Sequence, residues 1–322
     1  MRVVRDLVAA LAVLSLHVAH AAAPLLPVDD SYTASRRYRA YKEQFPAIEL
    51  PQLVFARGQR VLNDRLYKMV GDRELHCDVF LPVSAKGRTA APAVVFVHGG
   101  GWRAGNKSEF YPMANLLAQR GYAVFLPEFR LSPEAAYPAG LVDVNDAIVW
   151  VKAQSGAFRV DPARIAVAGG SSGGQMAALL AFSSDRNLFK SRDDDDTRVR
   201  ALIDLDGVLD FMSPLALKYE NAAGDSSYAA LWLGGSMERA TAKWQEASAA
   251  SYVGAGSPPT FIISSGELRF TAGKDDVLTG LERNGIRHRY LQLEDVPHTF
   301  WLFEPYLSRV VKEIDAFLRD VR

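Results

Sequence analysis

Five short, largely apolar runs recur along the chain and constrain its fold more than any other feature of the sequence. They are residues 93–97, 122–126, 164–168, 201–205 and 260–264. A strand that is buried on both faces of a parallel sheet has this apolar character. In the intervening segments 111–119 and 142–152, apolar residues recur three and four positions apart, as on one face of a helix. The alternation predicts an α/β fold with one mostly parallel sheet and helices on both of its faces.

The length and composition are those of an ordinary globular protein, with 322 residues of which 49% are hydrophobic and 23% are charged. Because no Pro-rich or Ser-rich linker divides residues 22–322, we predict a single domain there. Residues 211–259 carry several aromatic residues between two predicted strands, at the edge of the sheet where ligands bind. They predict a lid or a substrate wall, or else an insertion that buries its own aromatic side chains.

The N-terminus has the pattern of an export signal. Arg2 and Arg5 precede an apolar stretch over residues 7–18, and the small-residue pattern Ala-His-Ala follows at 19–21. This order predicts a signal peptide over residues 1–21. The apolar stretch is shorter than the roughly 20 residues that a membrane-spanning helix needs, which disfavours a permanent anchor. We therefore expect a periplasmic or secreted protein with no membrane attachment once the signal is removed.

Charge and metal-binding residue types narrow the function classes. Lys and Arg together number 37, and Asp and Glu also number 37, so no excess positive charge favours a nucleic-acid partner. The single cysteine and six histidines show no metal-ligand spacing. We expect no metal, no other cofactor and no nucleic-acid partner, and a small-molecule or oligosaccharide substrate instead.

A candidate nucleophile lies in the run Gly-Gly-Ser-Ser-Gly-Gly at residues 169–174, between a predicted strand and a predicted helix. In this context the G-x-S-x-G pattern is typical of a nucleophile elbow, a tight turn that raises a serine above the sheet edge. Two registers satisfy the pattern, centred on Ser171 or on Ser172. We predict Ser171 as the nucleophile because the strand ends at Ala168. Ser172 then supplies a backbone N–H group to the oxyanion hole.

A second motif, His-Gly-Gly-Gly-Trp at residues 98–102, leaves the predicted strand 93–97. Consecutive glycines let the backbone turn its N–H groups toward a substrate oxygen, and such loops form the other half of an oxyanion hole. We predict Gly100 and Gly101 as the donors. The Lys and Ser/Thr of a phosphate-binding P-loop are absent at the required spacing. His98 is expected to hold the loop through its ring nitrogens.

The candidate general base is His298, in the loop that follows the last predicted strand at residues 288–293. In this type of hydrolase the serine, the acid and the histidine follow one another in that order along the chain, which places the histidine near the C-terminus. His288 competes with His298, but it lies within the predicted strand.

These motifs together resemble the α/β-hydrolase esterases of the hormone-sensitive-lipase and BD-FAE-like group, which includes feruloyl and acetylxylan esterases. The resemblance also rests on Arg-Ala-Gly-Asn-Lys at 103–107, Phe-Arg-Leu-Ser-Pro-Glu at 129–134, Tyr-Pro-Ala at 137–139 and Asp143. It implies an α/β-hydrolase fold and a serine esterase that hydrolyses carboxylic esters, among them acetyl or aryl esters on polysaccharide fragments or other short-chain esters. It implies no cofactor.

The acid of the triad does not stand where the resemblance places it. Such esterases mostly carry an Asp about three residues after a glycine that follows the strand 260–264, and that count from Gly266 reaches Arg269. The resemblance of residues 269–276 to a subset of secreted esterases favours Asp275 as the acid. A carboxylate there also suits a helix N-terminus, where the helix dipole stabilises it. The other candidates are Glu267, Asp276 and, after the preceding strand, Asp206.

The absence of the usual acid leaves two other functions open. One is a peptidase or amidase of the same fold, which has to protonate an amine leaving group. The other is a noncatalytic binding module that keeps the fold without the triad acid.

Overall fold

The computed structural model describes residues 29, 31–83 and 90–321 of the chain. The predicted signal peptide at residues 1–21 lies outside the described residues. Among the described helices, none combines the length and the apolar character needed to cross a lipid bilayer.

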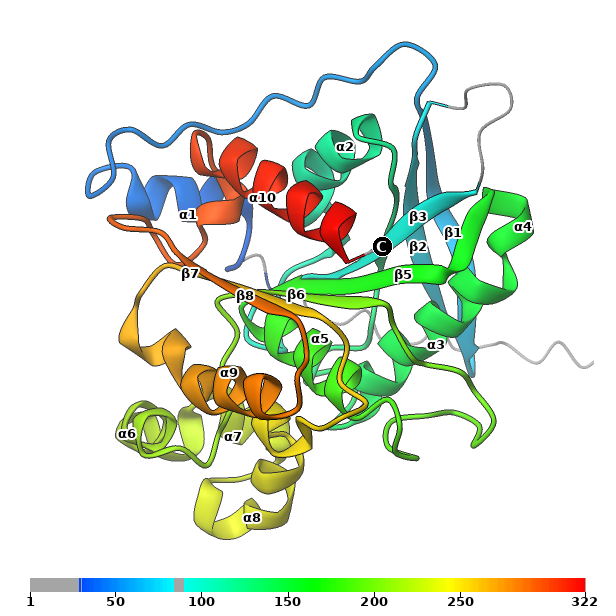
Figure 1. Ribbon diagram of the computed structural model, residues 1–322. Helices are drawn as coiled ribbons and strands as arrows, with labels where there is room; N and C mark the ends of the chain where they lie inside the picture. Colours follow the sequence, from blue (N-terminus) through cyan, green and yellow to red (C-terminus); the bar gives the residue numbers. More distant parts are fainter. Residues whose placement is uncertain (1–28, 30, 84–89, 322) are drawn as a thin grey trace, which may run out of the picture.

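The centre of the molecule is an eight-stranded sheet with the strand order β1-β2-β4-β3-β5-β6-β7-β8 (Figure 1). Strand β2 pairs antiparallel with β1 on one side and with β4 on the other. All the other neighbouring strands are parallel. The strands are β1 (Arg60–Val70), β2 (Arg73–Leu81), β3 (Ala91–Val97), β4 (Ala123–Pro127), β5 (Val160–Gly170), β6 (Ala201–Leu205), β7 (Thr260–Ser264) and β8 (His288–Gln292). The predicted α/β fold with a mostly parallel sheet is confirmed.

Helices cover both faces of the sheet and bury two separate cores (Figure 1). One face carries α1 (Ala34–Tyr41), α2 (Tyr111–Gln119) and α10 (Tyr306–Asp320). The other carries α3 (Ala139–Ala153), the short α4 (Ser155–Phe158), α5 (Ser172–Phe182) and α9 (Lys274–Arg283). In α10 the buried residues recur three and four positions apart, as expected for a helix with one apolar face.

The segment 211–259 forms α6 (Pro214–Ala223), α7 (Tyr228–Leu233) and α8 (Met237–Glu246), beyond α9 in Figure 1. Its Trp232 stacks on Trp102 of the glycine loop, which is the segment 98–107 after β3, with ring centroids 4.6 Å apart and planes 5° from parallel. Trp244 is fully buried against Phe211. The segment therefore buries its own aromatic residues and also packs against the loop that carries Gly100 and Gly101.

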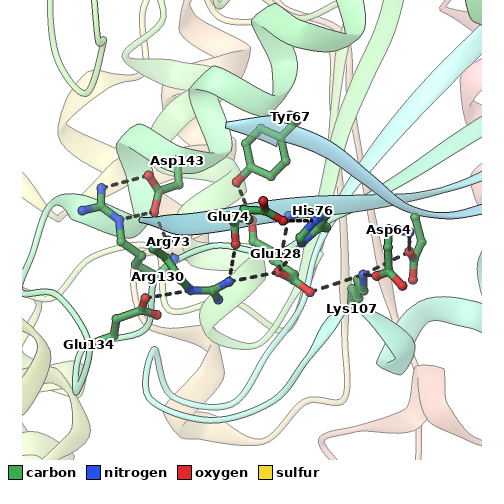
Figure 2. Close-up of polar contacts among 11 residues, drawn as sticks. Asp64, Tyr67, Arg73, Glu74, His76, Lys107, Glu128, Arg130, Glu134 and Asp143 are labelled. Atoms are coloured by element: carbon green, nitrogen blue, oxygen red, sulfur yellow. Dashed lines mark hydrogen bonds and ion pairs between the residues drawn. The ribbon is translucent and has the colours of Figure 1, made fainter. Parts of the chain in front are cut away.

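A network of charged side chains anchors the far end of the glycine loop to the sheet (Figure 2). Lys107 lies 3.0 Å from a carboxylate oxygen of Asp78, which is buried on β2, and 3.3 Å from Glu128. Beyond Glu128, the guanidinium of Arg130 donates two hydrogen bonds to Asp143 on α3, at 2.8 and 2.9 Å. Because Asp78 and Asp143 are almost inaccessible to solvent, these ion pairs are screened less than surface pairs. Through Lys107, the end of the loop is tied to β2 and to Glu128.

Candidate active site

The elbow between β5 and α5 places Ser171 at the carboxyl end of the sheet. Ser171 has φ 56° and ψ −125°, a backbone conformation that residues other than glycine rarely adopt. A Cβ on Gly169 or on Gly173 would collide with the backbone of a neighbouring segment, so both positions need glycine. The strand, the strained serine and the close-packed helix start together give the elbow predicted from the sequence.

Three side chains form a continuous hydrogen-bonded chain at this edge of the sheet. Nε2 of His298 lies 2.9 Å from Oγ of Ser171, and Nδ1 of the same ring lies 2.9 Å from Oδ2 of Asp206. His298 and Asp206 are 7% and 1% exposed. Asp206 also accepts hydrogen bonds from the backbone N–H and the hydroxyl of Ser265. This is the arrangement in which a base activates a serine and a carboxylate orients the base.

The structure corrects the prediction that Asp275 holds the histidine. Asp275 lies in the first turn of α9, its side chain is 86% exposed, and it pairs with Lys274 at 2.9 Å. Asp276 is exposed in the same helical turn, and Glu267 is exposed at the end of β7. The partner of His298 is instead Asp206, because its loop leaves β6 at the same sheet edge and its carboxylate reaches Nδ1.

The glycine loop reaches the same cavity as Ser171. Gly100 and Gly101 have φ of 118° and 63°, and the carbonyl of Gly100 accepts a hydrogen bond from the N–H of Ala104 at 3.1 Å. Gly100, Gly101 and Ser172 all line the cavity that contains Ser171 and His298. The structure thus brings the predicted oxyanion-hole residues together around the predicted nucleophile.

His98 is buried at the base of this loop. Its Nδ1 lies 2.8 Å from the carbonyl oxygen of Gly99, and its ring stacks on Phe129 with centroids 4.3 Å apart. Burial lowers the pKa of His98 to about 4, so its ring is neutral at pH 7. A neutral ring that donates to the loop carbonyl matches the structural role expected from the sequence.

Glu109 is a half-buried residue that the sequence motifs do not reveal. It accepts hydrogen bonds from the backbone N–H of Gly99 and from the indole N–H of Trp301, both at 3.0 Å. Burial raises its pKa to about 8. The Trp301 ring stands edge-on to His298, with centroids 5.5 Å apart. Glu109 therefore ties the glycine loop to the loop of the histidine, and no sequence motif marks it.

The cavity over Ser171 has a volume of about 340 Å³. One wall comes from the N-terminal segment, through Tyr32, Arg37 and Tyr41, and another comes from the segment 211–259, through Glu220 and Tyr228. Within the described part of the chain, no group of three or more His, Cys, Asp or Glu side chains is placed to hold a metal ion.

The sequence of the chain is similar to those of known esterases. The BD-FAE family model matches residues 77–268. The probable carboxylic ester hydrolase LipM of Mycobacterium tuberculosis is 30% identical over 207 residues, 59% of this chain and 44% of that protein. The esterase LipQ of the same organism is 29% identical over 261 residues, 76% of this chain and 58% of that protein. The chain thus spans about half the length of these curated relatives.

Solved structures show the same fold at lower sequence identity. Esterase 2 of Thermogutta terrifontis, phosphonylated by sarin, aligns with a TM-score of 0.68 at 22% identity, over 86% of this chain and 97% of that one. A truncated carbohydrate esterase from gut microbiota aligns with a TM-score of 0.67 at 19% identity, over 85% and 99%. With the α/β-hydrolase architecture in place and the family model matching more than half of its residues, the chain belongs to the BD-FAE family.

Proposed function

We propose that the protein is a serine esterase that hydrolyses carboxylic esters. The observation that carries this proposal is the hydrogen-bonded chain from Ser171 through His298 to Asp206, inside a cavity lined by the glycine loop. Each of the three groups has a role in acyl transfer, and their order along a line of hydrogen bonds matches those roles.

The reaction follows from the geometry. Oγ of Ser171 attacks the ester carbonyl carbon, its proton passes to Nε2 of His298, and the carbonyl electron pair moves onto the oxygen. Backbone N–H groups of Gly100, Gly101 and Ser172 stabilise that oxyanion. The imidazolium then gives its proton to the leaving alcohol. Water repeats the sequence on the acyl-enzyme, which releases the acid and restores Ser171.

Asp206 keeps the imidazole in the tautomer and orientation that this sequence needs. Because Nδ1 donates to the carboxylate, Nε2 is left without a proton and can accept the one from Ser171. The contact between Asp206 and His298 supplies a candidate for the triad acid, and this disfavours the noncatalytic module, which was proposed because the usual acid was absent. The amidase alternative keeps the same three groups and differs in the leaving group.

For the substrate we propose a small polar ester, such as an acetyl or aryl ester on a polysaccharide fragment. A volume of about 340 Å³ lies within the range of pockets for small ligands. Glu220 is only 4% exposed, and Arg269 donates to its Oε1 at 2.9 Å. Among the described residues, the other oxygen of Glu220 has no hydrogen-bond partner. A buried carboxylate with spare acceptor capacity favours a hydroxyl-bearing ligand over a purely apolar one.

Two further elements belong to this proposal. Residues 211–259 act as a substrate wall, supported by the positions of Glu220 and Tyr228 in the cavity lining. The protein is exported to the periplasm or secreted, supported by the signal pattern at residues 1–21. Sequencing the N-terminus of the mature protein checks the export step, with Ala22 expected as its first residue.

The test of the activity compares the wild-type chain with Ser171→Ala. A fluorophosphonate probe should label the wild type and not the variant, and p-nitrophenyl acetate should be hydrolysed only by the wild type. An aminoacyl p-nitroanilide separates the two hydrolase classes, because an amidase should cleave it and an esterase should leave it intact. Absence of both labelling and hydrolysis in the folded wild type would contradict the proposal.

A further inference from the structure

The ring of Phe270 lies flat against the imidazole of His298. The two ring centroids are 3.4 Å apart and the planes are 6° from parallel. A centroid separation this close to the contact distance of stacked rings leaves almost no lateral offset. Phe270 therefore covers one face of the ring that accepts the proton of Ser171.

Direct overlap of this kind has different energies for the two charge states of the imidazole. Neutral aromatic pairs prefer offset or edge-to-face arrangements, because the negative faces of two rings repel each other. A cation over the face of an aromatic ring is attracted by the same negative charge. The contact thus stabilises the imidazolium more than the neutral imidazole.

We propose that Phe270 is a positioning residue of the reaction described above, holding His298 in place and stabilising its imidazolium form. The inference rests on the proposed function, because the imidazolium forms only when Ser171 gives up its proton. An interaction that is stronger in the transition state than in the ground state raises kcat. The energy of a partly desolvated cation–π contact corresponds to about 5-fold to 30-fold in rate.

The position of Phe270 in the fold is part of the argument. It lies in the short helical turn Leu268–Thr271, directly after β7, the strand after which the family resemblance places the triad acid. Here the acid comes from β6 instead, and the loop after β7 supplies an aromatic face. The neighbouring Arg269 guanidinium lies 5.7 Å from the Phe270 ring, but Glu220 pairs with it and offsets its charge.

The proposal is tested by substitutions that change the charge distribution of the Phe270 ring and leave its shape almost unaltered. Phenylalanines with one, two and five fluorine atoms are incorporated at position 270, because fluorine withdraws the negative charge from the ring face. With p-nitrophenyl acetate we expect kcat and kcat/KM to fall together and progressively, by about 5-fold to 30-fold at five fluorines. Phe270→Tyr, which keeps the aromatic face, should retain most of the activity. Phe270→Leu, which removes that face, should lose about as much activity as the variant with five fluorines.

The matched control is the same fluorinated series at Phe158 of α4, which packs against Trp150 of α3 and takes no part in the cavity lining. Its kcat should stay at the wild-type value. An unchanged kcat across the series at position 270 would overturn the inference, as would a rise in KM alone, which would make Phe270 only a substrate wall. A wild type that fails to hydrolyse the ester and to react with the fluorophosphonate probe would contradict the proposed function itself.

Discussion

Asp206 and His298 are hydrogen-bonded at 2.9 Å although 92 positions separate them along the chain. Their contact depends on the parallel pairing of β6 with β7. The backbone N–H of Asp206 donates to the carbonyl of Ile263 at 3.0 Å, so the residue after β6 is held against the end of β7. The carboxylate thereby reaches the imidazole from the strand next to the one expected to carry the acid.

Replacing Asp206 by Asn should therefore remove most of the activity. The amide has nearly the same shape, but it no longer stabilises the imidazolium and no longer fixes the tautomer, and such a loss costs about 10⁴ in kcat. The matched control is Asp275→Asn, whose side chain is exposed in α9, and it should keep wild-type kcat. Full activity in Asp206→Asn with an inactive Asp275→Asn would restore the assignment made from the sequence.

The two adjacent serines of the elbow should respond in opposite ways. Ser171→Ala removes the hydroxyl that contacts Nε2 of His298 and should abolish hydrolysis. Ser172→Ala keeps the backbone N–H that faces the oxyanion and should retain much of the wild-type kcat. Steady-state rates on p-nitrophenyl acetate distinguish the two, and a more active Ser171→Ala would refute the chosen register.

A side chain at Gly100 should damage the oxyanion hole. Gly100 has φ 118°, and a Cβ there would collide with the carbonyl of Ala104, so Gly100→Val has to turn the loop away from its present path. Losing one oxyanion donor costs roughly 10²-fold to 10³-fold in kcat. Circular dichroism shows whether the sheet is intact. A folded variant with unchanged kcat would mean that this loop does not contact the reacting oxygen.

Asp204 should make the stability of the protein depend on pH. It is buried beneath the elbow, accepts a hydrogen bond from the N–H of Gly207 at 3.0 Å, and has its pKa raised to about 8 from 3.8, chiefly by burial. The folded state binds this proton more tightly than the unfolded state does. Its contribution to stability is therefore complete below about pH 4 and is lost as pH rises toward 8.

The variant Asp204→Asn, which cannot ionise, isolates this contribution. Its Tm relative to wild type should rise as the pH increases from about 4 to 8. Calorimetric scans at pH 5, 6.5 and 8 measure the difference. A Tm difference that stays constant over this range would show that Asp204 does not titrate there.

The features that could be predicted from the sequence are those that short motifs and local periodicity determine. Ser171 and Gly100 lie in motifs whose strand and helix context is local, and most of the parallel strands contain a largely apolar run. Strand β1 was missed because it forms the edge of the sheet: all 11 of its residues are exposed or half-buried, and charged and apolar residues are mixed along it. Edge strands lack the continuous apolar run that marks a buried strand.

The acid could not be predicted in the same way because its position depends on which strands are neighbours. Asp206 lies in a segment with no motif, and its proposed role depends on the ends of β6 and β7 meeting at one edge of the sheet. Glu109 was missed for a related reason. Its two hydrogen-bond partners, Gly99 and Trp301, lie far apart in the sequence and come together only in the folded chain.

The helix α1 and the residues just before it have a consequence for anyone who shortens this chain. Tyr32, Arg37 and Tyr41 form part of the cavity wall, yet they precede the stretch 77–268 that matches the family model, and His298 follows it. A fragment trimmed to residues 77–268 would therefore lack both the proposed general base and one wall of the cavity. Exchange of the N-terminal segment between relatives would instead leave Ser171, His298 and Asp206 in place and change one wall of the cavity.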